Sequence, residues 1–111
     1  MKLREAIKSK LAEFLALCSS HNVKNIYAFG SSITDNFNNE TSDIDLLIEI
    51  DAEDPILRGE ILISIWDKLE VFFQRKVDLL TNSSIKNPIL RKSINETKML
   101  IYDRKEHKIS V

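Results

Sequence analysis

The feature that most restricts the fold is the segment Asp43 to Ile50, in which the character of the residues alternates. Every second residue, from Ile44 to Ile50, is a large aliphatic one, and three of the four residues in the other positions are acidic. Successive side chains of a strand point to opposite faces, so this pattern predicts a strand with one apolar face. That face must be covered by another layer, so the segment predicts a sheet with helices packed against it.

The rest of the chain supplies those helices and further strands. Helical spacing of apolar residues predicts helices at 2–19 and 56–74, and Pro88 suits the start of a short one at 88–95. Strands are predicted at 23–29, 76–81 and 98–102. The expected fold class is α/β (α+β), a small mixed β-sheet with helices packed on one face. The length of 111 residues fits a single domain, residues 1–111, whose polar tail 104–111 is expected to be flexible.

The two longer helices are each expected to bury one apolar stripe. The stripe residues are Ile7, Leu11, Phe14, Leu15 and Cys18 in the first helix, and Leu57, Ile61, Ile65, Leu69 and Phe72 in the second. His21 lies in the break after the first helix and is expected to be an ordinary loop residue.

Charge and composition exclude several classes of protein. One cysteine cannot form an intramolecular disulfide or a cysteine zinc site, and no run of about 20 apolar residues could span a membrane. A cytoplasmic location is therefore expected. Residues 25–57 hold eight acids and no Lys or Arg, although the net charge is only −1. A clustered acidic segment suits a divalent cation, and the basic stripe of a general nucleic-acid binder is not evident.

A turn that suits a phosphate follows the first predicted strand. Gly30 lets the backbone turn sharply, and Ser31 and Ser32 come directly after it. If a short helix begins there, its free N–H groups and the serine hydroxyls would point at one spot. A plain strand-ending turn is the alternative interpretation of these residues.

Three carboxylates are expected on the polar face of the sheet. Asp43 and Asp45, which follow Ser42, project from the same side of their strand, and such a pair favours a cation between them. Asp78 lies between Val77 and Leu79 in another alternating strand, which a neighbouring position in the sheet would bring beside the pair. Three carboxylates on one face can hold two metal ions for an in-line displacement at phosphorus. An acidic strand end that simply faces water is the alternative.

Taken together and in order, FGSS at 29–32, SDIDLLIEI at 42–50 and KVDLL at 76–80 resemble the nucleotidyltransferases of the DNA polymerase beta superfamily. The short chain is similar to the minimal, stand-alone nucleotidyltransferases of bacteria and archaea, and the resemblance covers roughly residues 1–103. It implies transfer of a nucleoside monophosphate, AMP being the first candidate, from a nucleoside triphosphate such as ATP to an acceptor hydroxyl, with release of pyrophosphate.

The resemblance also implies roles for individual residues. Gly30, Ser31, Ser32 and Ser42 would bind the nucleotide, whereas Asp43, Asp45 and Asp78 would be catalytic and would bind two Mg²⁺ ions, for which Mn²⁺ could substitute. Asp78 would also help to deprotonate the acceptor hydroxyl. Many minimal members are paired with a helical HEPN-domain protein, and in such pairs the transferase acts as the antitoxin of a toxin–antitoxin system.

The chain departs from the family pattern in its phosphate loop. Many members carry a basic residue shortly after the Gly-Ser, but Ile33 to Asn36 include an acid instead. Lys86, Arg91 and Lys92 are candidates for the missing positive charge. Two other readings stay open: a nucleotidyltransferase fold that only binds a partner, and an unrelated α/β domain.

A macromolecular partner is expected on the polar face. Leu47 and Leu80 fall on that face, and apolar residues near a metal site suit a docked acceptor, for which a HEPN-domain protein is the first candidate. A neighbouring loop or a second copy of the chain could cover the two leucines instead.

Overall fold

The computed structural model describes residues 3–30, 43–105 and 108–109, and within them a five-stranded mixed sheet forms the centre of the molecule. The strands are β1 (Val23–Phe29), β2 (Ile44–Ile50), β3 (Val77–Leu80), β4 (Met99–Asp103) and β5 (Lys108–Ile109). Their spatial order is β3-β2-β1-β4-β5. Only β2 and β3 run parallel to each other, and the other neighbours are antiparallel, which confirms the expected mixed sheet.

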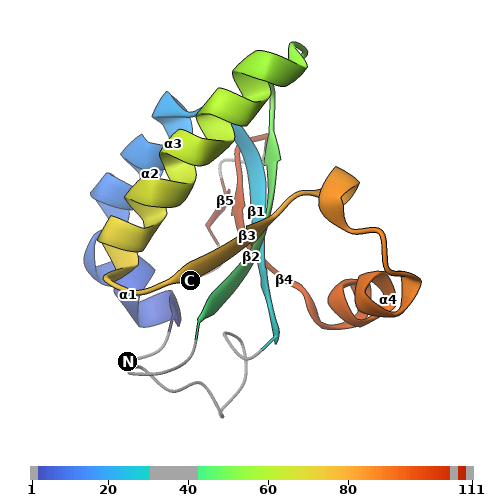
Figure 1. The fold of residues 1–111 in the computed structure, drawn as a ribbon. Helices are drawn as coiled ribbons and strands as arrows, with labels where there is room; N and C mark the ends of the chain where they lie inside the picture. Colours follow the sequence, from blue (N-terminus) through green and yellow to red (C-terminus); the bar gives the residue numbers. More distant parts are fainter. Residues whose placement is uncertain (1–2, 31–42, 106–107, 110–111) are drawn as a thin grey trace.

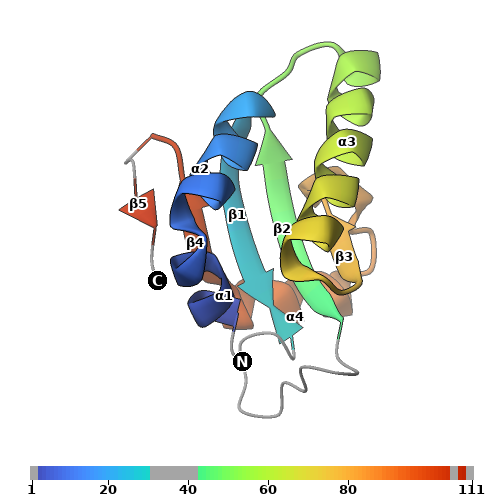
Figure 2. The same ribbon diagram turned by 90° about the vertical axis from the view of Figure 1, so that its left-hand side faces the viewer.

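Helices α1 (Leu3–Ser9), α2 (Leu11–Ser20) and α3 (Pro55–Phe73) form a layer on one face of this sheet (Figure 1). In the view of Figure 2 they lie in front of the strands, whereas α4 (Pro88–Thr97) lies behind them. Helix α3 connects the parallel pair, because parallel strands cannot be joined by a tight turn. A short 3-10 turn, η2 (Asn82–Ser84), precedes α4.

The main core lies between the sheet and the three-helix layer, as the alternation in β2 predicts. All four aliphatic residues of that strand's apolar face are buried, with at most 7% of their surface exposed. They pack with residues from every helix of the layer, including Ile7, Phe14, Cys18, Ile65 and Leu69. Burial of these large side chains is the main favourable contribution to folding.

The first helix differs from the expectation because it is broken. Lys10 has non-helical dihedral angles, φ −132° and ψ 47°, and it separates α1 from α2. Phe14 and Cys18 are buried as predicted, but Leu11 and Leu15 are 38% and 40% exposed, because α2 begins anew after the break. In α3, Leu57 is also exposed, because the first turn of that helix extends past the end of the sheet (Figure 1).

The polar face of the sheet is not open at Leu47, which corrects a sequence-based expectation. A second apolar cluster covers this residue and leaves 3% of its surface exposed. The buried members of the cluster are Phe29, Leu47, Ile85 and Ile94, and Tyr27 and Leu80 pack against them. Because α4 and the segment before it supply this cover, Leu47 and Leu80 give no evidence of a partner.

Two further local features could not be seen in the sequence pattern. His21 lies in the turn after α2, as expected, but it is buried, with 8% of its surface exposed: its Nδ1 lies 2.9 Å from the carbonyl oxygen of Leu17, and its Nε2 lies 3.0 Å from Oγ of Ser64. In the polar tail, Lys108 and Ile109 pair with β4 as strand β5. Among the described residues, no helix is long and apolar enough to cross a membrane.

Candidate active site

Pairing between β2 and β3 brings two of the three predicted carboxylates together. In the parallel register, Asp45 of β2 lies directly beside Asp78 of β3. Neighbouring strands are about 4.8 Å apart, so the two side chains rise from adjacent positions on the same face. Asp43 precedes β2 by one residue and is exposed, as is Asp78, whereas Asp45 is half-buried. The predicted convergence of acidic residues on one edge of the sheet is therefore present in the backbone.

Gly30 is the residue that lets the chain pass close to Asp45. It follows β1 directly, and its φ of +66° lies in the left-handed region that favours glycine. A Cβ atom built on Gly30 would lie 2.7 Å from Oδ2 of Asp45, which is closer than two such atoms can approach. Both the backbone conformation and the contact therefore require glycine at the end of β1, beside the acidic pair.

The electrostatics of the site are dominated by its carboxylates. Burial, together with the negative charges of Asp78 and Asp43, raises the pKa of Asp45 to about 6. The folded chain therefore holds an ionised Asp45 at neutral pH at a cost in free energy, which a bound cation would relieve.

Two side chains of α3 hold β3 next to the position of Asp78. The indole Nε1 of Trp66 donates to the carbonyl oxygen of Val77 at 2.7 Å, and the N–H of Val77 donates to Oε2 of Glu70 at 2.9 Å. These bonds occupy backbone groups on the outer edge of the sheet, where unpaired groups could form hydrogen bonds with a strand of another molecule. Sequence periodicity gives no sign of the hydrogen bond from Trp66.

The donor atoms suit a hard divalent cation. Within the described residues, no three acidic, histidine or cysteine side chains converge as a ready-made metal site. Mg²⁺ does not require such a site, because proteins usually hold it by one or two carboxylates together with substrate phosphates and water. The adjacent oxygens of Asp45 and Asp78, with Asp43 nearby, therefore fit Mg²⁺ in that mode.

Three other predicted binding residues, Ser31, Ser32 and Ser42, lie outside the described residues. Of the three proposed sources of positive charge, Lys86 is exposed, whereas Arg91 and Lys92 have contacts within the protein. Arg91 donates to the carbonyl oxygens of Asn82 and Ile85, at 2.7 and 2.9 Å, and so holds η2 against α4. Lys92 lies 4.0 Å from Glu96 on the exposed surface of α4. Arg91 thus has a structural contact, and Lys92 pairs with an acid of its own helix.

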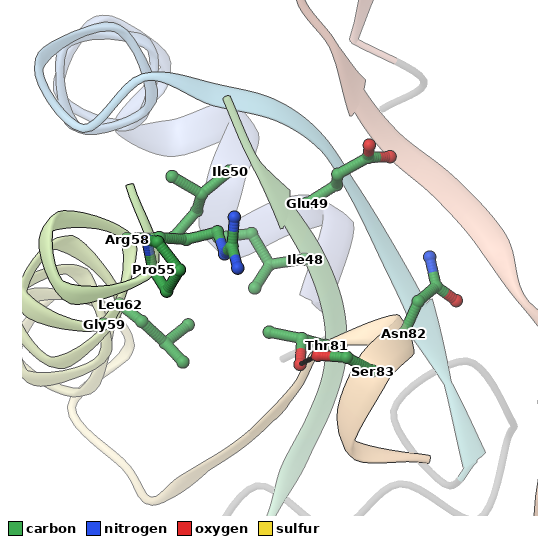
Figure 3. Close-up of a pocket in the computed structure, with 10 residues that line it drawn as sticks. All are labelled: Ile48, Glu49, Ile50, Pro55, Arg58, Gly59, Leu62, Thr81, Asn82 and Ser83. Atoms are coloured by element: carbon green, nitrogen blue, oxygen red, sulfur yellow. Dashed lines mark hydrogen bonds between the residues drawn. The ribbon is translucent and has the colours of Figure 1, made fainter. Parts of the chain in front are cut away.

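A cleft of about 380 Å³ lies elsewhere, where β3 ends and β2 continues alone (Figure 3). The side chain of Arg58 extends over it from α3, and Thr81 and Ser83 line the opposite wall (Figure 3). The cleft also includes Glu49, four residues along β2 from Asp45, or about 13 Å at the rise of a strand. None of the predicted catalytic residues lines it, so it is separate from the acidic site.

Comparisons with known proteins agree with this geometry. The model of the family described as "Nucleotidyltransferase domain" matches residues 2–109. A "Putative protein adenylyltransferase" of Methanocaldococcus jannaschii is 42% identical over 86 residues, which are 78% of this chain and 82% of that protein. A second protein of the same name and organism is 38% identical over 103 residues, which are 92% of this chain and 99% of that protein.

Solved structures support the fold. A structure described as a putative minimal nucleotidyltransferase superposes with a TM-score of 0.60 at 23% identity, over 89% of this chain and 95% of that one. A toxin–antitoxin crystal structure with AMP-PNP gives a TM-score of 0.54 at 24% identity, over 86% of this chain and 74% of that one. A mutant of the toxin–antitoxin MntA-HpeT gives 0.56 at 22% identity, with the same coverage. The family match, the curated relatives and the arrangement of Gly30 and the acidic residues lead to one conclusion: this chain belongs to the nucleotidyltransferase family.

Proposed function

We propose that this nucleotidyltransferase transfers AMP from ATP to a hydroxyl group of a partner protein. The observation that carries the proposal is the side-by-side placement of Asp45 and Asp78, with Asp43 and Gly30 at the same edge of the sheet. Curated relatives that share 38–42% of their aligned residues with this chain are named as protein adenylyltransferases, which supports a protein as the acceptor.

Each residue of the site has a part in this reaction. Asp43 and Asp45, together with Asp78, would hold up to two Mg²⁺ ions, or Mn²⁺ in their place. When bound, the ions would offset the charge of the triphosphate and stabilise charge that develops during transfer. Gly30 keeps the backbone clear of Asp45, and Ser31, Ser32 and Ser42 are proposed as partners of the nucleotide.

The transfer itself is a single displacement at the α-phosphorus. The acceptor oxygen forms a bond to the α-phosphorus, and the bond from that phosphorus to the bridging oxygen of the pyrophosphate breaks. The pyrophosphate leaves with the electron pair of the broken bond. The carboxylate of Asp78 takes the proton of the acceptor hydroxyl, which is the task of a general base.

The partner is proposed to be a toxin, with this chain as its antitoxin. Two of the superposed structures are described as toxin–antitoxin assemblies, and the resemblance to minimal nucleotidyltransferases makes a helical HEPN-domain protein the first candidate. Such a partner would present a tyrosine, serine or threonine hydroxyl to the exposed side of Asp78.

Labelling with ATP that carries ³²P at the α-position tests the proposal. The chain is co-expressed with the product of its neighbouring gene, and label should appear on the partner in the presence of Mg²⁺. Asp78→Asn should abolish labelling, whereas Asp67→Asn, an exposed carboxylate on the outer side of α3, should not.

The same experiment can refute it. Full labelling by Asp78→Asn would show that the catalytic assignment is wrong. Nucleotide binding without transfer to any acceptor would support a binding module instead.

A further inference from the structure

A basic side chain, Lys98, lies on the same face of the sheet as the acidic site. Its Nζ is 4.6 Å from the centre of the Tyr27 ring, an arrangement in which the ring attracts the cation. Tyr27 belongs to β1 and packs against the cluster that contains Leu47. The ammonium group is therefore held over the face that α4 partly covers, which is the face of Asp45 and Asp78.

Strand register gives the position of Lys98 relative to the acids. Phe29 of β1 is paired with Asp45 of β2, and on the other side of β1 Ala28 is paired with Met99 of β4. Lys98 directly precedes Met99, so Lys98 and Asp45 flank the same end of β1. Two strand spacings separate them, which is about 10 Å.

The backbone of Lys98 is also held in place, since it stands at the junction of α4 and β4. Its N–H donates to the carbonyl oxygen of Ile94 at 2.7 Å, and the next residue begins the strand. The side chain is exposed, and within the described part of the chain no acidic residue forms an ion pair with it. A cation that is held in place and is paired with none of the described acids can accept an anionic ligand without first breaking an ion pair to them.

We infer that Lys98 binds the β- and γ-phosphates of the nucleoside triphosphate, an inference that rests on the proposed function. Transfer requires the α-phosphorus at Asp45 and Asp78, and the rest of the triphosphate then extends along the face. A phosphate accepts a charge-assisted hydrogen bond from an ammonium group. A nucleobase would have to displace Lys98 to stack on the side of the Tyr27 ring over which the ammonium group lies.

A structural role alone would predict something different. A cation at the C-terminal end of a helix stabilises the helix through its dipole, and this applies to Lys98 at the end of α4. Loss of that effect would lower the stability of the folded protein. It would not change the affinity for one nucleotide relative to the other. The ratio of triphosphate affinity to monophosphate affinity therefore separates the two roles.

Isothermal titration of the full chain with AMP-PNP and with AMP, both with Mg²⁺, measures that ratio. Lys98→Met should weaken AMP-PNP binding about tenfold, the loss of one hydrogen bond between charged groups, and should change AMP binding less than twofold. Lys98→Arg should retain most of the affinity. Lys68→Met removes an exposed lysine from α3, on the other face of the sheet, and should match the wild type.

The outcomes are distinct. Equal affinity of wild type and Lys98→Met for AMP-PNP, or an equal loss for both nucleotides, overturns the role of Lys98 and leaves the proposed function standing. A wild type that binds neither nucleotide overturns the proposed function and this inference with it. Partial misfolding of a variant would lower the stoichiometry of binding but not the affinity, so it cannot imitate the expected result.

Discussion

Replacing Asp45 by asparagine should stabilise the metal-free protein at neutral pH. The pKa of this carboxyl rises from 3.8 to about 6 on folding, mainly through burial and then through the charges of Asp78 and Asp43. An ionised Asp45 is thus less favourable in the folded chain than in the unfolded one. The variant removes the charge and keeps the shape of the side chain.

The size of the effect follows from that shift. About two pKa units correspond to about 3 kcal/mol at 1.36 kcal/mol per unit. Asp45 is only half-buried, so screening by solvent reduces this figure, and we expect a gain of about 1–2 kcal/mol in the free energy of unfolding at pH 7. A stabilising substitution at a site that is strained for function is a common trade-off.

The gain should depend on pH in a defined direction. In the wild type the folded state takes up a proton as the pH falls through about 6, whereas the unfolded state does so only near 3.8. The wild type therefore recovers stability between these values. The advantage of Asp45→Asn should be complete above about pH 7 and should disappear below about pH 4.

Urea unfolding with a chelator present, repeated between pH 4 and pH 8, checks this prediction. Asp67→Asn serves as the control for an exposed carboxylate and should change stability by less than about 0.5 kcal/mol. A variant that is less stable than the wild type at pH 7, or one whose difference does not change with pH, would refute the electrostatic account of the site.

Two further predictions concern packing around the site. Gly30→Ala should lower stability by about 1–3 kcal/mol and abolish nucleotide binding, because the added Cβ would meet Asp45 and the φ of this residue is +66°. Gly59 is a helical residue, and a Cβ added there would have nothing within 4 Å, so Gly59→Ala should raise stability by about 0.5–1 kcal/mol. Thermal unfolding compares the pair, and an equally stable Gly30→Ala would contradict the close contact. Leu47→Ala should cost about 2–5 kcal/mol in urea unfolding, because Leu47 is buried against Ile94, and a cost below about 0.5 kcal/mol would mean that this face is open.

Sequence periodicity by itself determined which face of each central strand is buried. The aliphatic residues of β2 line the main core because alternation along a strand is a local property of the backbone. For the same reason, Asp45 was correctly placed on the side of the strand opposite the core. The wide stripe of α3 was also predicted at Ile65, Leu69 and Phe72, which are buried.

Local patterns failed where a neighbouring element decides exposure. Leu47 lies on the polar side of β2, yet it is buried because α4 crosses to that face and supplies Ile94. His21 lies in the turn after α2, as expected, yet it is buried, and Ser64 of α3 lies 3.0 Å from its ring. In both cases the partner is far away in the sequence, and periodicity contains no information about it.

The active site needed both kinds of information. The order of the motifs indicated which residues are candidates for the chemistry, and the alternation along each strand placed their carboxylates on one face. Only the tertiary structure decided that Asp78 stands beside Asp45, since this depends on parallel pairing through α3 and on the bonds from Trp66 and Glu70 to β3. It also decided that Lys98 lies over Tyr27 on that face, because this contact between the end of α4 and β1 depends on how the chain returns to the sheet from α4.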